Sequence, residues 1–494
     1  MHPIRGSFSA LALSIASIVA LGVSVTHASA HGAERRVWPV ALTGLAQIAP
    51  VFCETTGCGV GSTATSALYP DMLYPYPTIA ANGDLYLVDY GNASEPLRVV
   101  GTDGRINRVI RVPGGVSSIA VARDGRIAAR GDDDVIREIS PNGKIRPIAG
   151  DLVGDKSGPL EDCACGDGGP ARKANLADVS SLAYDPLGRL VIADTAHYRI
   201  RRIAANGTIS TIAGTGKACS TTPPDPPCSP SGTLARSANI RAPRRVVFAP
   251  DGTLWFTAER YGQNAVLAHV ETDGRLTYAD HGPIEGLTIT PDGSLYTLLR
   301  VTAPADAVRG KRARILRISP DNKTATPILG GANASGCRKI EVALTCGDGR
   351  TALQARLDSN ANSFLASDSH GGLYFGSEGQ EIRYLPPPHG EPVRLGLVIE
   401  KPKTQRFLRG RTIAVRFLTT TRDARVTLQL ARKIGNRVTI INLPGTTTGA
   451  LSGTVRWNTQ VAGNRVRPGD YALQITAKSQ GRIATRQLPI TITH

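Results

Sequence analysis

Residues 166–216 form the clearest unit in this chain and constrain its fold most strongly. Three turn sequences, at 185–188, 194–197 and Asn206-Gly207, divide this stretch into four short runs rich in isoleucine, valine, leucine and tyrosine. Because Asn-Gly supplies the positive φ angles that a tight hairpin needs, the pattern predicts one four-stranded antiparallel sheet. A lone sheet of this size cannot bury both of its faces, so we expect it to stack on others like it.

The turn between the first two strands recurs along the chain, and each copy indicates one sheet. Six copies, without a helical period in the mature chain, predict an all-β fold: a six-bladed β-propeller over residues 31–396, in which radial stacking buries both faces of every sheet. To close the ring, we expect residues 42–52 to supply the last strand of the sixth sheet, with residues 393–396 as the alternative. The six turns lie at Asn82-Gly83, Asp124-Gly125, Leu187-Gly188, Asp251-Gly252, Asp292-Gly293 and Gly371-Gly372.

The central unit resembles the NHL repeat of bacterial exported proteins. The matching residues are Gly-Asp-Gly-Gly-Pro-Ala at 166–171, Ile-Ala-Asp at 192–194 with Arg-Ile-Arg at 199–201, and Thr-Ile-Ala-Gly at 211–214. Other units keep pieces of this pattern, such as Leu97-Arg98, Ile136-Arg137 and Ile382-Arg383. The resemblance is specific for one repeat and implies the same propeller fold.

Residues 397–494 differ from the rest of the chain in pattern and in charge. Six short strand-like runs with turn residues between them predict a small antiparallel β-sandwich. Trp457-Asn458, Gly463-Asn464 and Arg-Pro-Gly-Asp-Tyr at 467–471 resemble the immunoglobulin-like module related to flagellar hook-capping proteins. From 401 to 494 there are 17 lysines and arginines against two acids, a net +15 out of +17 for the whole chain.

The N-terminus and the cysteines both indicate export. Arg5 precedes an apolar run at 11–25, and Ala-Ser-Ala at 28–30 offers a cleavage site, so residues 1–30 are interpreted as a secretory signal peptide. No other run is long enough to span a bilayer, so we expect a secreted, extracellular or cell-wall-associated protein. The eight cysteines favour local disulfides over a structural metal; the pairs are Cys53 with Cys58, Cys163 with Cys165, Cys219 with Cys228, and Cys337 with Cys346.

Five acids occupy comparable places, at the turn between the second and third strands of successive units. They predict a ring of carboxylates that binds a cation or a basic ligand. The alternative, which the residue type favours, is that each acid accepts hydrogen bonds from turn backbone N–H groups. His197, in the strongest repeat, is interpreted as a structural turn residue. The five acids are Asp89, Asp132, Asp194, Glu259 and Glu378.

A calcium-dependent enzyme is the alternative function. Six-bladed propellers include calcium-dependent lactonases and lyases, and calcium takes six to eight oxygen ligands. We find no nucleophile elbow, zinc helix or phosphate loop, and assign no catalytic residue and no cofactor other than this possible calcium. The polar residues near the starts of the innermost strands, which would serve as calcium ligands, are Asp178, Glu285, Asn360 and Asn362.

The sequence therefore favours a non-catalytic exported binding or scaffold protein. Its propeller would recognise a protein or carbohydrate ligand. The basic C-terminal module would attract anionic cell-wall polymer, because few aromatic residues are present there to stack nucleic-acid bases.

Overall fold

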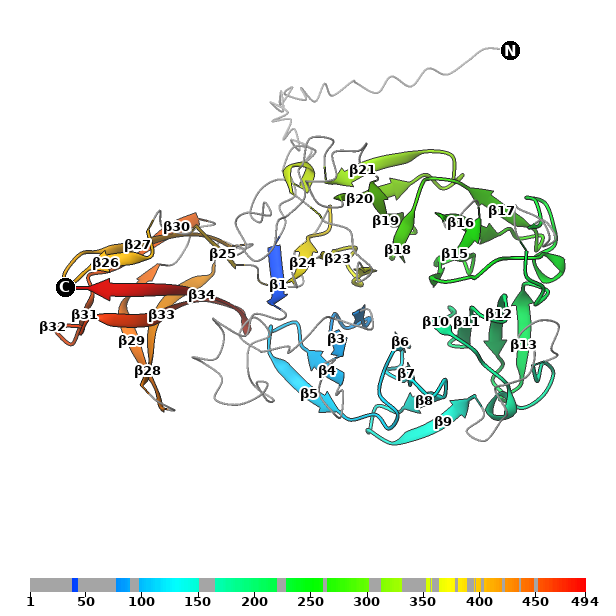
Figure 1. Ribbon diagram of the computed structural model, residues 1–494, viewed down its shortest axis with the longest axis horizontal. Coiled ribbons are helices and arrows are strands. Elements are labelled where there is room, and N and C mark those ends of the chain that lie inside the picture. Colours follow the sequence, from blue (N-terminus) through cyan, green and yellow to red (C-terminus); the bar gives the residue numbers. More distant parts are fainter. Residues whose placement is uncertain are drawn as a thin grey trace, which may run out of the picture. The chain divides into compact units, whose positions relative to one another are not determined.

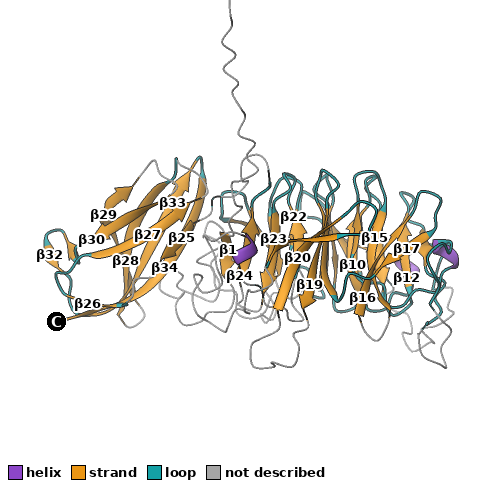
Figure 2. Ribbon diagram, turned by 90° about the horizontal axis from the view of Figure 1, so that it is seen from above, coloured by secondary structure: helices purple, strands orange, loops and turns teal. Residues whose placement is uncertain are grey.

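The structure, a computed structural model, is all-β. It describes residues 38–42, 77–88, 97–150, 165–219, 228–260, 264–301, 312–330, 352–355, 357, 364–377, 381–388, 395, 397–400, 404–419, 423–434, 437–447 and 452–494. Within these residues the helical elements are three short 3-10 turns, η2 (Ala171–Lys173), η3 (Ala235–Ser237) and η4 (Ala352–Gln354), seen among the strands in Figure 2. None of the described helices could cross a membrane. The predicted signal peptide, residues 1–30, lies outside the described residues.

Successive four-stranded antiparallel sheets make up the larger part of the described chain (Figure 1). Within each sheet the strands follow one another in sequence, except that an N-terminal strand joins the last sheet. The first three sheets contain β2 (Thr78–Ile79), β3 (Leu85–Val88), β4 (Leu97–Val100) and β5 (Ile106–Ile110); β6 (Ser118–Val121), β7 (Ile127–Arg130), β8 (Ile136–Ile139) and β9 (Ile145–Ala149); and β10 (Val179–Tyr184), β11 (Leu190–Asp194), β12 (Arg199–Ile203) and β13 (Ile209–Ala213).

The next three sheets follow the same plan. They contain β14 (Val246–Phe248), β15 (Leu254–Arg260), β16 (Asn264–Val270) and β17 (Leu276–Ala279); β18 (Ile284–Ile289), β19 (Leu295–Val301), β20 (Arg312–Ile318) and β21 (Ala325–Leu329); and β22 (Leu365–Ser367), β23 (Leu373–Ser377) and β24 (Glu381–Leu385) with β1 (Trp38–Leu42). The first strand of each sheet contacts the first strand of the next, and β22 contacts β2. These contacts give the sheets a propeller-like, cyclic order.

The turn between the first two strands has one geometry in all six described sheets. Its glycine adopts a positive φ, for which glycine has no steric cost. The amide of that glycine donates a hydrogen bond to the carbonyl three residues earlier, as in Gly188 N to Asp185 O at 2.8 Å. The six turns read from the sequence are thus confirmed, with φ between 74° and 92° at Gly83, Gly125, Gly188, Gly252, Gly293 and Gly371.

Neighbouring sheets share their cores, as β11 shows. Its side chains point alternately to opposite faces, and all five residues of the strand are buried. Ile192 packs in a cluster with Ile136 of the preceding sheet, whereas Val191 packs with Phe256 of the following sheet. A fully buried aliphatic side chain stabilises a fold by about 1.5–3 kcal/mol, so each sheet depends on both of its neighbours.

The strand that completes the last sheet comes from the N-terminal end, as expected, but from different residues. β1 pairs antiparallel with β24, with Trp38 opposite Tyr384 and Leu42 opposite Glu381. The expected strand was to begin at Leu42, where β1 ends, and residues 43–52 lie outside the described residues. Apolar residues occur on both sides of Leu42, so the pattern of apolar and polar residues did not show which of them pair with the last sheet. Pro39 is tolerated because β1 is an outer strand, whose second edge needs no amide donor.

Of the alternative closing strand, residues 393–396, only one residue is described. Leu395 is described and is not part of a strand. The strand that follows it, β25 (Leu397–Glu400), pairs instead with β27 (Ile413–Thr419) of the C-terminal region.

The C-terminal region forms two larger sheets and a small hairpin. A three-stranded sheet has the order β25, β27 and β30 (Ser452–Trp457), and a five-stranded sheet has the order β26 (Arg406–Leu408), β34 (Arg482–Thr493), β33 (Gly469–Ser479), β28 (Arg425–Ile434) and β29 (Arg437–Thr447). The hairpin pairs β31 (Gln460–Val461) with β32 (Asn464–Arg465). Side chains of both sheets share one apolar cluster, which includes Phe417 and Trp457 from the first and Leu473 and Ile490 from the second.

All six strand-like runs expected in this region are strands, but β25, β26 and the two short strands of the hairpin, β31 and β32, were not expected. β26 is only three residues long and lies in the basic stretch 401–411, whose polar sequence indicates a linker or a first turn. It pairs in parallel with the end of β34, a long-range partner that local sequence does not reveal.

Candidate functional site

Asp194, the candidate ligand residue in the strongest repeat, lies in a buried network. Its Oδ2 accepts a hydrogen bond from Nη1 of Arg201 at 3.2 Å. Its Oδ1 accepts from the Ala177 amide at 3.0 Å and lies 2.9 Å from Nδ1 of His197. The Asp194, His197 and Arg201 side chains are all completely buried. This geometry favours the interpretation of Asp194 as a hydrogen-bond acceptor inside the fold.

Arg201 connects this sheet to the loop that precedes it. Its Nε and Nη2 donate to Oδ1 of Asp167 at 3.1 and 2.8 Å, and it also donates to the carbonyls of Cys165 and Asn175. The Asp of the Gly-Asp-Gly-Gly motif and the Arg of the Arg-Ile-Arg motif are therefore partners in one structure. The same third-strand arginine is buried in three other sheets, as Arg98, Arg137 and Arg383.

Asp132 lies in a different setting, in the exposed turn between β7 and β8. The two acids that follow it each bind an arginine. Asp133 accepts from Nη1 and Nη2 of Arg137 at 3.0 and 2.6 Å, and Asp134 forms an ion pair with Arg130. Burial alone would raise the pKa of Asp133, but the hydrogen bonds from Arg137 hold it below its usual range. Asp89 and Glu378 lie outside the described residues, so the structure does not test the expected ring as a whole.

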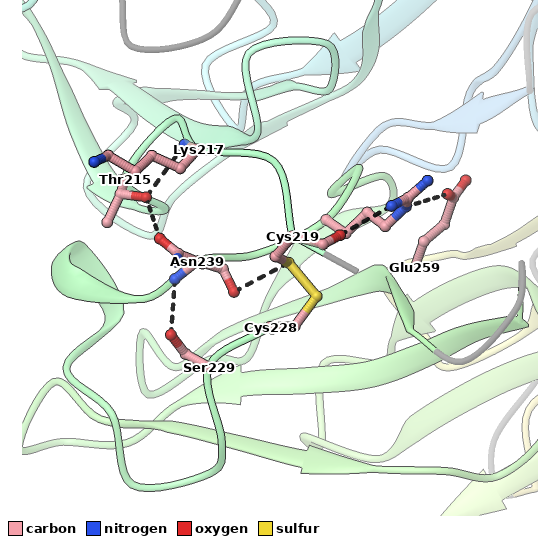
Figure 3. Close-up of a disulfide and its surroundings, with 8 residues drawn as sticks. Thr215, Lys217, Cys219, Cys228, Ser229, Asn239 and Glu259 are labelled. Atoms are coloured by element: carbon pink, nitrogen blue, oxygen red, sulfur yellow. Dashed lines mark hydrogen bonds and ion pairs between the residues drawn. A yellow bond between two sulfur atoms is a disulfide. The ribbon is translucent and has the colours of Figure 1, made fainter. Parts of the chain in front are cut away.

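Glu259 lies beside a disulfide-closed connector (Figure 3). Its Oε1 accepts from Nη2 of Arg244 at 3.1 Å, and its Oε2 lies 3.7 Å from Nε of Arg241. Arg241 in turn donates to the carbonyl of Cys219 at 2.9 Å. Glu259 thus has two arginine partners that belong to the fold.

The disulfide between Cys219 and Cys228 confirms one of the four expected pairs. Cys165 is also disulfide-bonded. Asn239 joins separate parts of this connector, since its Oδ1 accepts from Thr215 Oγ1 at 2.6 Å and its backbone amide donates to Ser229 Oγ at 2.9 Å. The other predicted disulfide cysteines, Cys53, Cys58, Cys163, Cys337 and Cys346, lie outside the described residues.

The four candidate calcium ligands are described only in part. Asp178 is exposed and precedes β10 with a φ of 48°. Glu285 is in β18, and its Oε1 lies 3.5 Å from Nε of Arg300. Asn360 and Asn362 lie outside the described residues. Among the side chains that are described, no group of three or more His, Cys, Asp or Glu residues is placed to hold a metal ion.

A central cavity of about 210 Å³ is lined by the first strands of all six described sheets. Most of its polar lining consists of serine and threonine hydroxyls, and the two serines described next form hydrogen bonds with groups outside their own strands. Ser180 Oγ lies 2.6 Å from Thr195 Oγ1, and Ser367 Oγ donates to the carbonyl of Ile289 at 2.8 Å. Its volume falls below the 300–1,000 Å³ or so that is typical of ligand pockets.

A wider cavity of about 500 Å³ opens where these first strands end. Three carboxylates line it, those of Asp124, Asp185 and Asp368, and each accepts hydrogen bonds from the turn that follows it. Asp185 accepts from Nε of Arg189 at 2.7 Å and from its amide at 2.9 Å. Asp368 accepts from the amides of His370 and Gly372 at 2.9 and 2.8 Å. These aspartates shape the turns.

The largest of these cavities, about 690 Å³, is a groove between the sheet β6–β9 and the sheet β10–β13. We call it the inter-sheet groove. Its charged lining residues come from both sheets and from η2, and its apolar lining includes Pro147, Ile148, Leu187 and Ile203. Four arginines and one glutamate line it: Arg126, Arg146, Arg172, Arg189 and Glu138.

Glu138 organises the charges of the inter-sheet groove. Its Oε2 accepts from Nη1 of Arg126 at 3.0 Å, and its Oε1 accepts from Nη2 of Arg146 at 2.7 Å. Burial alone would raise the pKa of Glu138, but the two arginines hold it below its usual range. The Arg126 guanidinium also lies over the ring of Tyr184, 5.4 Å from its centre. Burial raises the pKa of Tyr184, so its hydroxyl is protonated at neutral pH.

Sequence reasoning did not find the inter-sheet groove. Its residues come from two sheets and a connector, and only the packing of one sheet on the next brings Arg126 to Tyr184. One local signal was present: Glu138 lies in the short strand β8 directly before Ile139, and its side chain is buried. A charged residue in such a place needs a partner.

Exposed arginines gather at one end of the C-terminal region. The turn after β26 contacts the β31–β32 hairpin, because Arg409 Nη2 donates to the carbonyl of Arg465 at 3.4 Å and the Gly410 amide donates to Thr459 Oγ1 at 2.8 Å. Leu408, the last residue of β26, is 53% exposed. We call the four exposed side chains Arg409, Arg411, Arg465 and Arg467 the arginine cluster.

Comparisons with known proteins give short or distant similarities. No family model matches the chain. The chain is 35% identical over 89 residues to human Teneurin-4 and 42% identical over 73 residues to mouse Teneurin-1, which is 18% and 14% of this chain. It spans about 3% of the length of each of these curated relatives.

Three similar solved structures are a streptogramin B lyase, an auxiliary nutrient binding protein from Bacteroides ovatus, and the calcium-binding protein regucalcin from Agrobacterium tumefaciens. Their identities to this chain are 14%, 13% and 15%, with TM-scores of 0.35, 0.39 and 0.36. The alignments cover 63%, 71% and 64% of this chain and 77%, 77% and 91% of those chains. Similarity this distant assigns no activity to the chain.

Proposed function

We propose that this protein is an exported binding protein with two functional parts. A six-bladed NHL-type β-propeller over residues 31–396 recognises a ligand, and a basic immunoglobulin-like β-sandwich over residues 397–494 holds the protein at an anionic surface of the cell envelope. The observation that carries this proposal is the arginine cluster.

The arginine cluster suits an anionic surface because its charges are exposed and of one sign. Residues 401–494 contain only two acids, Asp423 and Asp470, and each accepts a hydrogen bond from a hydroxyl, of Ser479 and Thr491 respectively. Each lysine or arginine close to an anionic membrane surface contributes about 1 kcal/mol of attraction. Such attraction is screened beyond about 8 Å at physiological ionic strength, so binding should weaken with salt.

Two features support export. The Cys219–Cys228 disulfide is of the kind that persists in oxidising compartments. Residues 1–30 have the pattern of a secretory signal peptide. Both agree with a protein that works outside the cytoplasm, where anionic wall polymers are accessible.

Retention of the full-length protein on purified cell-wall material tests the proposal. A variant with all four arginines of the arginine cluster changed to glutamine should lose most retention at about 0.15 M salt. The matched control removes the same number of exposed positive charges elsewhere and should be retained like the wild type. Equal retention of the two variants, or full retention after deletion of residues 401–494, would refute the tether. The control residues are Arg111, Arg123, Arg236 and Lys323.

A further inference from the structure

The inter-sheet groove has the composition of a site for an acidic ligand with an apolar part. We propose that it binds an extended peptide segment in which a carboxylate side chain neighbours an aliphatic one. This inference rests on the proposed ligand-binding role of the propeller and names the site and the chemical class of the ligand. At about 690 Å³ the groove lies in the size range of ligand sites.

Positive charge is available at the rim of the groove. The Arg146 side chain is 64% exposed, and its Nε and Nη2 both donate to Oε1 of Glu138, which leaves its Nη1 without a hydrogen bond to a described residue. Arg172 is exposed in η2, with no ion pair to another described residue. A planar guanidinium fork binds a carboxylate through two parallel hydrogen bonds. Glu138 fixes Arg146 in place before the ligand arrives.

Tyr184, which lines the groove, carries a hydroxyl donor. The Tyr184 hydroxyl is buried and has no hydrogen-bond partner among the described residues. Because burial raises the pKa of Tyr184, the hydroxyl keeps its proton at neutral pH and can donate it to a ligand oxygen. A buried polar group without a partner is unfavourable, so a ligand that supplies an acceptor gains affinity.

Apolar side chains near these donors suit an aliphatic group. Leu187 is 77% exposed at the edge of the groove, and Ile148 and Ile203 also line it. A sugar ring would need an open aromatic face on which to stack. Tyr184 is the aromatic residue among the described lining residues, and the Arg126 guanidinium covers one face of its ring. The lining therefore fits a peptide better than an acidic sugar.

Fluorescence anisotropy with labelled, N-acetylated hexapeptides of alternating residues tests the proposal. The full-length protein is used with its arginine cluster changed to glutamine, so that acidic peptides cannot bind there. The Glu-Leu peptide should bind, whereas the Gln-Leu peptide and the Glu-Ser peptide should each bind about tenfold more weakly. Equal affinities for the Glu-Leu and Gln-Leu peptides, or no binding of either, would overturn the proposal.

Substitutions in the groove locate the binding. The double variant Arg146→Gln with Arg172→Gln should weaken Glu-Leu binding about tenfold or more, and Tyr184→Phe should weaken it several-fold while keeping the ring. Arg236→Gln is the matched control, because Arg236 has in η3 the place that Arg172 has in η2, outside the groove. Undiminished binding in the double variant would place the peptide elsewhere and overturn the site.

Two further results separate the alternatives. A galacturonate oligosaccharide that binds the groove when the Glu-Leu peptide does not would replace the peptide with an acidic sugar and overturn the proposal. Retention on cell-wall material depends on the arginine cluster and not on the groove. Peptide binding together with equal retention of the wild type and the arginine-cluster variant therefore refutes the tether alone. Retention that requires the arginine cluster, without peptide binding, refutes the groove alone.

Discussion

Asp194 and Arg201 form an ion pair in which both side chains are completely buried, with Oδ2 of Asp194 3.2 Å from Nη1 of Arg201. Asp167 lies on the other side of the guanidinium, 2.8 Å from Nη2. The three residues belong to separate motifs of the repeat, and one arginine joins them. The repeat pattern therefore encodes a structural connection between a loop and its sheet.

Removing the arginine should strongly destabilise the propeller. Arg201→Met leaves Asp194 buried without its cationic partner, and breaking a buried pair in this way costs about 3–5 kcal/mol. Urea unfolding followed by circular dichroism measures the loss. Arg202→Met, at the next position of β12 and on its other face, is the matched control and should cost about 1 kcal/mol or less. A similar small cost for Arg201→Met would show that the network does not hold the sheet.

A turn glycine should be replaceable only by residues that accept a left-handed backbone. Gly207 has a φ of 82°, and a Cβ built on it would meet no atom within 4 Å. Gly207→Ala should therefore cost about 1–2 kcal/mol from backbone strain alone, and Gly207→Asn should cost less. Asn322 is a native precedent, because it adopts a φ of 56° in the corresponding turn of the fifth sheet. Urea unfolding checks the order, and Ala205→Ser in the same turn is the neutral control. Equal stability of the two Gly207 variants would contradict the strain argument.

These turns explain why so much of the fold could be predicted from sequence. A positive φ favours glycine, which occupies the same place in all six turns, so these turns could be identified in the sequence. The strands were then expected between the turns. The third strands illustrate this: β4 spans Leu97–Val100 and begins with Leu97-Arg98, the two residues that match the repeat pattern. The closing strand β1 was misplaced because pairing with β24 is a long-range choice that no turn residue records.

The candidate site was harder to predict for the same reason. The sequence identified Asp194 and His197 as notable, and both are in the buried network. It gave no sign that Arg126 of one sheet would reach Tyr184 of the next, because that contact is created by the packing of sheets. The residues that line a groove between two sheets can be predicted from the sequence only when they belong to one motif.

The stability of the protein should fall in acid partly through Glu138. The pKa of Glu138 is lower in the folded protein than its ordinary value of about 4.3. At pH values between these two pKa values, Glu138 binds more protons in the unfolded chain than in the folded protein. This contribution is complete above the unfolded pKa and is lost as the pH falls through the folded pKa. Glu138→Gln should therefore flatten the decline between about pH 5 and pH 3, by at most about 1.4 kcal/mol per pH unit.

Urea midpoints measured at several pH values check this expectation. The deficit of Glu138→Gln relative to the wild type should be largest near neutral pH and should shrink as the pH falls. Two parallel curves would show that the Glu138 carboxylate contributes no pH dependence.

The Cys219–Cys228 disulfide should stabilise the connector before the fourth sheet. The two cysteines are 9 residues apart, and closing a loop of that length restricts the unfolded chain by about 2–3 kcal/mol. The double variant Cys219→Ser with Cys228→Ser should lose about this amount in urea unfolding. Adding dithiothreitol to the double variant is the control that reveals the contribution of other disulfides, such as that of Cys165. A double variant as stable as the wild type would mean that the loop is already ordered in the unfolded chain.

A tyrosine should secure the edge of the C-terminal core. The Tyr471 hydroxyl donates to the carbonyl of Arg467 at 2.6 Å, and the Arg432 guanidinium lies 5.1 Å from the centre of its ring. Tyr471→Phe keeps the buried ring but removes the hydrogen bond, and should cost about 0.5–1.5 kcal/mol locally. Hydrogen exchange of the full-length protein should therefore quicken in β33, whereas exchange in β11 should not change. Unchanged exchange in β33 would show that ring packing alone holds the turn before that strand.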